Sequence, residues 1–107
     1  MLQPELEALD REALARLQLE RMRVTLARCL TNVAWRGRLG DVRPDDLRRI
    51  DDWARLPFLT KDDLRDAYPY GLACGAAYRR VHMSSGTTGN PIQLPPGPLN
   101  TRWVAAR

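Results

Sequence analysis

Proline and glycine are unevenly distributed along this chain, and their positions limit where regular structure can form. The 107 residues include eight prolines and seven glycines, which concentrate after residue 68. Proline lacks a backbone donor and glycine weakens helices and strands, so the second part is expected to be poor in regular structure. A chain of about a hundred residues makes at most one small domain. The first 70 residues are therefore expected to supply most of the helices.

Apolar residues recur at helical spacing near the amino terminus. The pattern runs from roughly Leu6 to Thr31 and predicts a long amphipathic helix with one wet face. The spacing shifts phase once, near Leu19. This helix is expected to be the largest regular element of the chain.

Two shorter helices are expected after it. Pro44 suits the start of a helix that continues to Leu56, where Pro57 stops it. Thr60 and Asp63, three residues apart, form a capping-box pattern that predicts the start of a third helix, which Tyr68-Pro69 ends.

Four hydroxyl residues and two glycines occur together in the segment Ser84–Pro91, which reads SSGTTGNP. Glycine admits positive φ, so such a loop can turn its backbone N–H groups toward anionic oxygens, and hydroxyls add donors. Apolar residues alternate on both sides of the segment, which predicts a strand before it and a strand after it. The candidate phosphate-binding residues are Ser84, Ser85, Gly86, Thr87, Thr88, Gly89 and Asn90.

A plain loop is the alternative reading of the same segment. Serine, threonine, glycine and proline also cluster in ordinary linkers. A Walker-type phosphate loop needs Lys followed by Ser or Thr after its second glycine, and position 90 is Asn. Any phosphate would be held by amide and hydroxyl dipoles, helped by Arg79 or Arg80.

A second motif precedes this loop. Leu56–Asp66 reads LPFLTKDDLRD, Tyr68–Gly71 reads YPYG, and Val81-His82 leads into the loop. Together with Ser84–Pro91, these motifs resemble the amino-terminal portion of the phenylacetate–CoA ligases and the related coenzyme F390 synthetases, which are AMP-forming (adenylate-forming) ligases. The resemblance runs from about Leu17 to Pro91. Two motifs at this separation are far more specific than either alone.

The resemblance implies a fold and a reaction. The implied fold is an α+β fragment, in which amino-terminal helices precede a strand–phosphate loop–strand piece of the ligase large domain. Residues 1–107 would be an incomplete amino-terminal part of the adenylating domain, helical over 1–70, strand–loop–strand over 78–94 and divergent over 95–107. The complete family enzyme uses ATP and Mg²⁺ to adenylate an aryl carboxylic acid, releases pyrophosphate, and transfers the acyl group to coenzyme A.

The chain departs from the family pattern in places. Asn90 stands where the family often has Lys, and Pro95–Asn100 replace the turn that usually opens the next helix. Family members are also several times longer, and the elements that bind adenine and the acyl carboxylate, with the catalytic lysine, would lie downstream. The chain alone is therefore predicted to be inactive and to bind none of these cofactors tightly. Its expected partner is the downstream ligase portion, if that is encoded separately.

One alternative to this function stays open, a truncated, non-catalytic product that serves as an interaction fragment. The oligomeric state also stays open, because the complete enzyme could form a homodimer. Neither is decided by the residues of this chain.

Composition narrows the location and the redox state. No run of about eighteen apolar residues occurs, so no membrane span is expected. The acidic start, Met1–Glu12, lacks the apolar segment of a secretory signal, which predicts a cytoplasmic protein. Cys29 and Cys74 have no neighbour at metal-ligand spacing, so they are read as reduced, structural residues.

The positive charge raises nucleic acid as a rival partner. The net charge is +4, and arginines with an intervening Trp35 could line a binding stripe. Acidic residues interleave with these arginines throughout, which favours a solvated helix face and predicts no nucleic-acid partner. The arginines concerned are Arg16, Arg21, Arg23, Arg28, Arg36 and Arg38.

No catalytic constellation can be assembled from the sequence. His82 is the only histidine and is expected to be a hydrogen-bonded structural residue. Lys61 and Arg65 are expected to pair with Asp62, Asp66 or backbone carbonyl oxygens rather than with substrate. No Ser–His–acid set, carboxylate pair or metal cluster is present, so neither catalytic nor metal-binding residues are predicted.

Overall fold

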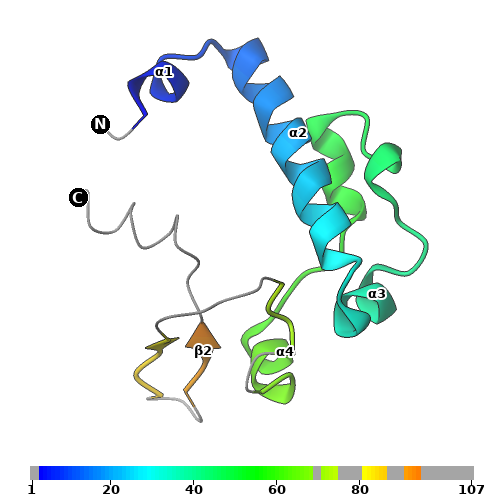
Figure 1. Cartoon of the computed structure of the whole chain (residues 1–107), viewed down its shortest axis with the longest axis vertical. Helices are drawn as coiled ribbons and strands as arrows, with labels where there is room; N and C mark the ends of the chain where they lie inside the picture. Colours follow the sequence, from blue (N-terminus) through cyan, green and yellow to red (C-terminus); the bar gives the residue numbers. More distant parts are fainter. Residues whose placement is uncertain (1–2, 69–70, 75–80, 87–90, 95–107) are drawn as a thin grey trace. The chain divides into compact units, whose positions relative to one another are not determined.

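A computed structural model describes residues 3–68, 71–74, 81–86 and 91–94 of the chain (Figure 1). The chain divides into two compact units, Met1–Pro57 and Phe58–Arg107, and each is described by itself. Helices dominate the first unit, and the described residues of the second include the helix α4 and a two-stranded antiparallel sheet, which agrees with the predicted α+β class. The elements are α1 (Pro4–Glu7), α2 (Arg11–Cys29), α3 (Val33–Leu39), the 3-10 helices η1 (Pro44–Asp46) and η2 (Ile50–Arg55), α4 (Lys61–Asp66), β1 (His82–Met83) and β2 (Gln93–Leu94).

The long helix predicted from Leu6 to Thr31 is two helices, so that prediction is wrong at its start. α1 ends at Glu7, and Asp10 has an extended backbone with φ −67° and ψ 168°. The Asp10 carboxylate accepts the backbone N–H of Ala13 at 2.7 Å. Asp10 is thus an N-cap that starts α2 afresh, and α2 is continuous through Leu19, where the apolar spacing shifts phase.

A further helix, α3, was not predicted. Asn32 begins it by accepting the backbone N–H groups of Ala34 at 2.9 Å and Trp35 at 3.2 Å. Gly40 ends it with a φ of 58°, a left-handed conformation that favours glycine. Both residues are ordinary helix boundaries, but the helix between them has only seven residues, too few for a clear periodicity.

The core of the first unit lies where α2 meets α3 and the 3-10 helices. Met22 and Leu26 of α2 pack with Leu39 and with Leu47, whose side chain is fully buried. The η1 and η2 helices lie alongside α2 (Figure 1). Partly buried apolar side chains surround this cluster and complete the core; they are Leu19, Cys29, Leu30, Trp35, Val42, Ile50 and Leu56.

Residues 44–56 form two 3-10 helices rather than the one helix expected to begin at Pro44. Leu47 interrupts them with an extended backbone, at φ −85° and ψ 96°, and places its side chain in the core. Asp46 accepts the backbone N–H of Arg43 at 2.8 Å, which closes the first turn. Local side-chain bonds to the backbone thus compete with a continuous helix.

Asp52 starts η2 in the same way. Its Oδ2 accepts the backbone N–H groups of Arg48 at 2.7 Å and Arg49 at 2.9 Å. These bonds favour the charged form, so the backbone N–H of Arg49, and next that of Arg48, lower the pKa of Asp52 below its ordinary value of 3.8. The positive charge of Arg55 acts in the same direction.

The capping box predicted for α4 is confirmed. The Thr60 Oγ1 accepts the backbone N–H of Asp63 at 3.2 Å, and Asp63 Oδ2 accepts the backbone N–H of Thr60 at 2.7 Å. Arg65 pairs with Asp62 at 2.6 Å, as expected. One role, accepting a backbone N–H at the start of a helix, is therefore shared by Asp46, Asp52 and Asp63.

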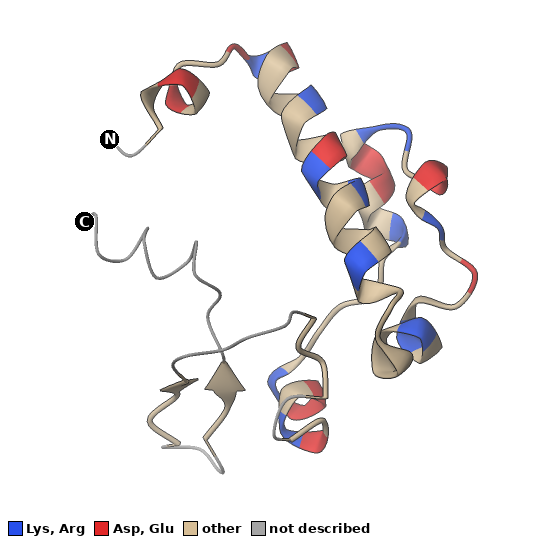
Figure 2. Cartoon of the chain, in the orientation of Figure 1, with Lys and Arg blue, Asp and Glu red and all other residues tan. Residues whose placement is uncertain are grey.

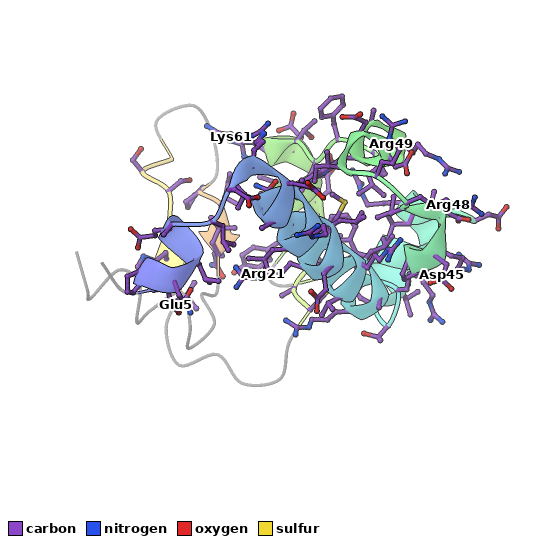
Figure 3. All side chains as sticks on the ribbon, turned by 90° about the horizontal axis from the view of Figure 1, so that it is seen from above. Glu5, Arg21, Asp45, Arg48, Arg49 and Lys61 are labelled. Carbon is purple, nitrogen blue, oxygen red and sulfur yellow. The ribbon has the colours of Figure 1, made fainter. Side chains whose placement is uncertain are left out.

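Charged residues of both signs occur in α2, η2 and α4, whereas α1 carries only acidic residues and α3 only basic ones (Figure 2). Asp45, Arg48 and Arg49 point away from α2 (Figure 3) and are exposed. Two residues of the possible nucleic-acid stripe have structural contacts. Arg23 donates a hydrogen bond to the Leu47 carbonyl oxygen, and Trp35 packs against the core. None of the helices in the described ranges is both long and apolar enough to cross a bilayer.

Candidate functional site

Two short antiparallel strands flank the loop that carries the candidate phosphate-binding residues. His82 of β1 lies opposite Leu94 of β2, and Met83 lies opposite Gln93. Each strand has only two residues. The pairing brings the two ends of the intervening loop together at Ser84 and Ile92.

Ser84 closes the loop with two hydrogen bonds to Ile92. Its backbone N–H donates to the Ile92 carbonyl oxygen at 3.0 Å, and the Ile92 N–H donates to Ser84 Oγ at 2.9 Å. A serine hydroxyl has one proton and two lone pairs, so Ser84 keeps its proton for a further acceptor. This structural role of Ser84 was not predicted, although serine commonly bonds nearby backbone groups.

Gly86 has the backbone conformation expected of it. Its φ is 68°, and it lies half-buried two residues after Ser84, while Ser85 between them is exposed. Glycine adopts a positive φ at little cost, whereas residues with a side chain rarely do. The other candidate residues, Thr87, Thr88, Gly89 and Asn90, lie outside the described residues. Phosphate binding by the loop therefore stays a prediction.

The apolar residues of the two strands lie on opposite faces of the hairpin. Paired residues of antiparallel strands share a face, so His82 and Leu94 point the same way. Side chains alternate along a strand, which places Ile92 on that face, and Val81 with Met83 on the other. Ile92 is 6% exposed, whereas Val81 is 43% and Met83 58% exposed. Each face of the hairpin thus carries apolar surface.

His82 differs from the expectation of a hydrogen-bonded structural residue. Its side chain is exposed, and the imidazole makes no hydrogen bond with any described residue. The direct cross-strand neighbour of His82 is Leu94, whose side chain is apolar. His82 is therefore not a structural anchor of the hairpin.

Other reactive side chains add little to this site. Neither Cys29 nor Cys74 forms a disulfide, and Cys74 donates to the Leu72 carbonyl oxygen at 3.6 Å. Within the described ranges, no group of three or more His, Cys, Asp or Glu residues could hold a metal ion. Of the candidate site, the structure describes Ser84, Ser85 and Gly86.

The amino-acid sequence is similar to curated phenylacetate–coenzyme A ligases. It is 47% identical to the enzyme of Thermus thermophilus over 96 residues, which are 85% of this chain and 22% of the relative. Against the Pseudomonas putida enzyme it is 43% identical over 91 residues, 80% of this chain and 21% of the relative. The Escherichia coli K12 enzyme gives 38% identity with the same coverage.

The match covers most of this chain but a small part of each relative. The chain spans about a fifth of the length of the ligases it matches. No model of a protein family matches it. Similarity at 38–47% identity over 80–85% of the chain is nevertheless too extensive for a shared motif alone. The chain therefore belongs to the phenylacetate–coenzyme A ligase family, of which it represents a segment.

Proposed function

We propose that this chain is the amino-terminal segment of an ATP-dependent, AMP-forming aryl-acid–CoA ligase of the phenylacetate type. In that enzyme it would form part of the adenylating domain and carry the phosphate-binding loop. The observation that carries the proposal is the 47% identity to the Thermus thermophilus ligase over 85% of the chain. The proposal keeps the cytoplasmic location expected from the sequence.

The loop geometry is compatible with a phosphate ligand. The paired strands fix both loop ends, the Ser84 hydroxyl proton stays available as a donor, and Gly86 has positive φ. Concave loops of backbone N–H groups and hydroxyls bind anions without a fixed positive charge. These features support Ser84, Ser85 and Gly86 as ligand residues, and the sequence pattern extends the set through Asn90.

The residues of the loop would act by positioning and by charge stabilisation. Donors on the β and γ phosphates would hold ATP in line while the carboxylate of the aryl acid attacks the α phosphorus. The same donors would stabilise negative charge on the departing pyrophosphate, where preorganised dipoles are most effective. The proposal assigns Mg²⁺ and coenzyme A to the complete enzyme and assigns no residue of this chain to either.

A non-catalytic role is the second candidate. The chain corresponds to only 21–22% of the ligases it matches, and this coverage favours a segment that functions only with the remainder. On that alternative the chain would be an interaction piece without activity of its own. The two candidates differ in whether a complete enzyme that contains this segment depends on the loop.

A chimera tests the proposal. The chain replaces its matching segment in the Thermus thermophilus ligase, and ATP–pyrophosphate exchange is measured with phenylacetate and related aryl acids. We expect exchange from the chimera and none from the isolated chain. A folded chimera without exchange would contradict the proposed function, and exchange by the isolated chain would contradict its dependence on the remainder.

A further inference from the structure

The outer edges of the hairpin carry backbone groups that the two strands do not use. In an antiparallel pair, opposite residues alternate between those that exchange backbone hydrogen bonds and those that do not. The Ser84 N–H donates to the Ile92 carbonyl oxygen at 3.0 Å, so that pair is of the first kind. The adjacent pair, Met83 and Gln93, is therefore of the second kind. The N–H and C=O groups of these two residues point outward, away from the opposite strand.

Met83 is exposed at its side chain as well as open at its backbone. Its exposed fraction is 58%, and that of Val81, on the same face of β1, is 43%. The backbone of Met83 makes no hydrogen bond with any described residue. A sheet edge with open backbone groups and apolar side chains is the form to which a further strand adds. A two-stranded hairpin is also marginal by itself, and a third strand stabilises it.

The two edges of the hairpin differ in sequence. Proline has no backbone N–H and is one of the residues that hinder the addition of a strand at an edge. Pro91 precedes β2, and Pro95 and Pro96 follow it, so prolines flank that strand on both sides. The segment Val81–Ser84, which contains β1, has no proline, no lysine and no carboxylate. The edge that favours the addition of a strand is therefore that of β1.

We propose that the outer edge of β1 pairs with an extended strand from the part of a phenylacetate-type ligase that these residues do not represent. The Met83 N–H and C=O would bond that strand, and its apolar side chains would cover Val81 and Met83. The inference rests on the proposed function. The relatives supply this occupant, because most of each relative lies outside the match. An edge as short as β1 favours a strand that a complete ligase carries in the same polypeptide, which avoids the entropy cost of association, over a second copy.

Amide hydrogen exchange in the chimera with the Thermus thermophilus ligase gives the first test. Met83 and Gln93 supply the two outward amides of the hairpin, one on each edge, so Gln93 is an internal control. Corrected for intrinsic rates, Met83 should exchange at least about tenfold more slowly than Gln93, because only Met83 gains a hydrogen bond. Equal exchange in the chimera would overturn the pairing of β1. A Met83 amide that is equally protected in the isolated chain would overturn the proposed occupant.

Proline substitutions give the second test. Met83→Pro removes the outward N–H and spares the bonds between Ser84 and Ile92, so exchange of the Ile92 amide in the isolated chain should not change. In the chimera, Met83→Pro should lower the Tm by at least about 2 °C. Gln93→Pro, at the equivalent outward position of β2, is the matched control and should lower the Tm by less. Met83→Leu keeps the N–H and an apolar side chain and should retain the parent Tm. Equal losses from the two proline variants would contradict the choice of the β1 edge.

Further outcomes separate this inference from its rivals. If a second copy pairs with β1, the isolated chain will be a dimer by light scattering and Met83→Pro will make it a monomer, which would overturn the proposed occupant. A protected Met83 amide in a chimera without pyrophosphate exchange would leave the strand pairing intact and contradict the proposed function. An active chimera in which Met83 exchanges as fast as Gln93 would contradict the strand pairing alone.

Discussion

Arg23 of α2 donates from Nε to the carbonyl oxygen of Leu47, 2.7 Å away and 24 residues later in the chain. Leu47 is also the fully buried side chain of the first unit. One residue thus supplies both the centre of the core and the acceptor for a charged donor on the helix that packs against it. This contact fixes the extended residue between η1 and η2 against α2.

Arg23→Met should lower the free energy of unfolding by about 1–3 kcal/mol, because the Leu47 carbonyl oxygen then lies part-buried without its donor. Arg21→Met is the control. Arg21, labelled in Figure 3, is exposed, and its guanidinium forms no hydrogen bond with the described residues. Urea unfolding of both variants measures the difference. Equal losses would mean that the Arg23–Leu47 bond contributes nothing.

Leu47→Ala should destabilise the first unit by about 2–5 kcal/mol, since removing a fully buried leucine leaves a cavity in addition to the lost apolar transfer energy. Val24→Ala on α2 is the matched control, because Val24 is 56% exposed. It should change stability by less than about 0.5 kcal/mol. Circular dichroism during urea unfolding reports both. A small effect at Leu47 would contradict the core described for this unit.

Asp52→Ala should make the stability of the first unit less dependent on acid pH. The Arg49 and Arg48 backbone N–H groups lower the pKa of Asp52 in the folded chain, so its contribution is complete above the ordinary value of 3.8. That contribution is lost as the pH falls through the lower folded pKa. The Tm difference from the parent should therefore be constant above about pH 5 and shrink below 3.8.

Asp51→Ala is the control for this pH series. Asp51 pairs with Arg49 at 3.3 Å, and both side chains are largely exposed, so the pair is expected to contribute little. A melting series between about pH 2 and pH 7 covers the relevant range. If the difference for Asp52→Ala grows on acidification, the assigned role of Asp52 is wrong.

Ser84→Ala in the chimera should speed hydrogen exchange at the Ile92 amide about fivefold, because one neutral hydrogen bond contributes about 1 kcal/mol. Ser84→Thr keeps the hydroxyl and should restore the protection. Ser85→Ala removes an exposed hydroxyl that makes no bond to the described residues, and it should leave Ile92 unchanged. Equal effects of the two alanine variants would contradict the closure of the loop by Ser84.

Gly86→Val in the chimera should slow acyl-adenylate formation at least about tenfold, since a β-branched residue is strained at the φ of 68°. Thr87→Ala should also slow adenylation while changing the Tm by less, and Asn90→Lys should leave activity equal or higher. Rapid-mixing measurement of acyl-adenylate beside a melting curve separates the two effects. Loop variants that adenylate at the parent rate would remove the phosphate-binding role.

The sequence predicted best those features that depend on residues close together in the chain. The Thr60–Asp63 capping box and the positive φ of Gly86 follow from local chemistry and are present in the structure. Asp10 and Asn32 are equally local cap signals, but the apolar periodicity continues across Asp10, and α3 is too short to show a periodicity of its own.

Other features depend on contacts that the sequence does not show. Leu47 interrupts the helix expected after Pro44 because its side chain packs against α2 and its carbonyl oxygen accepts a hydrogen bond from α2. Both contacts join residues far apart in the chain. The same holds for Ser84, whose hydroxyl bonds a residue beyond the loop. Tertiary packing overrides local preference at such positions.

The opposite faces of the hairpin bear on the order in which the chain folds during synthesis. The first unit has its own core around Leu47 and can fold once it has left the ribosome. The hairpin carries Met83 on one face and Ile92 on the other, and a two-stranded hairpin is marginal in water without packing partners. Ile92 is already buried and Met83 is exposed, so the hairpin gains its full stability only when the Met83 face is covered too, and it is expected to form last.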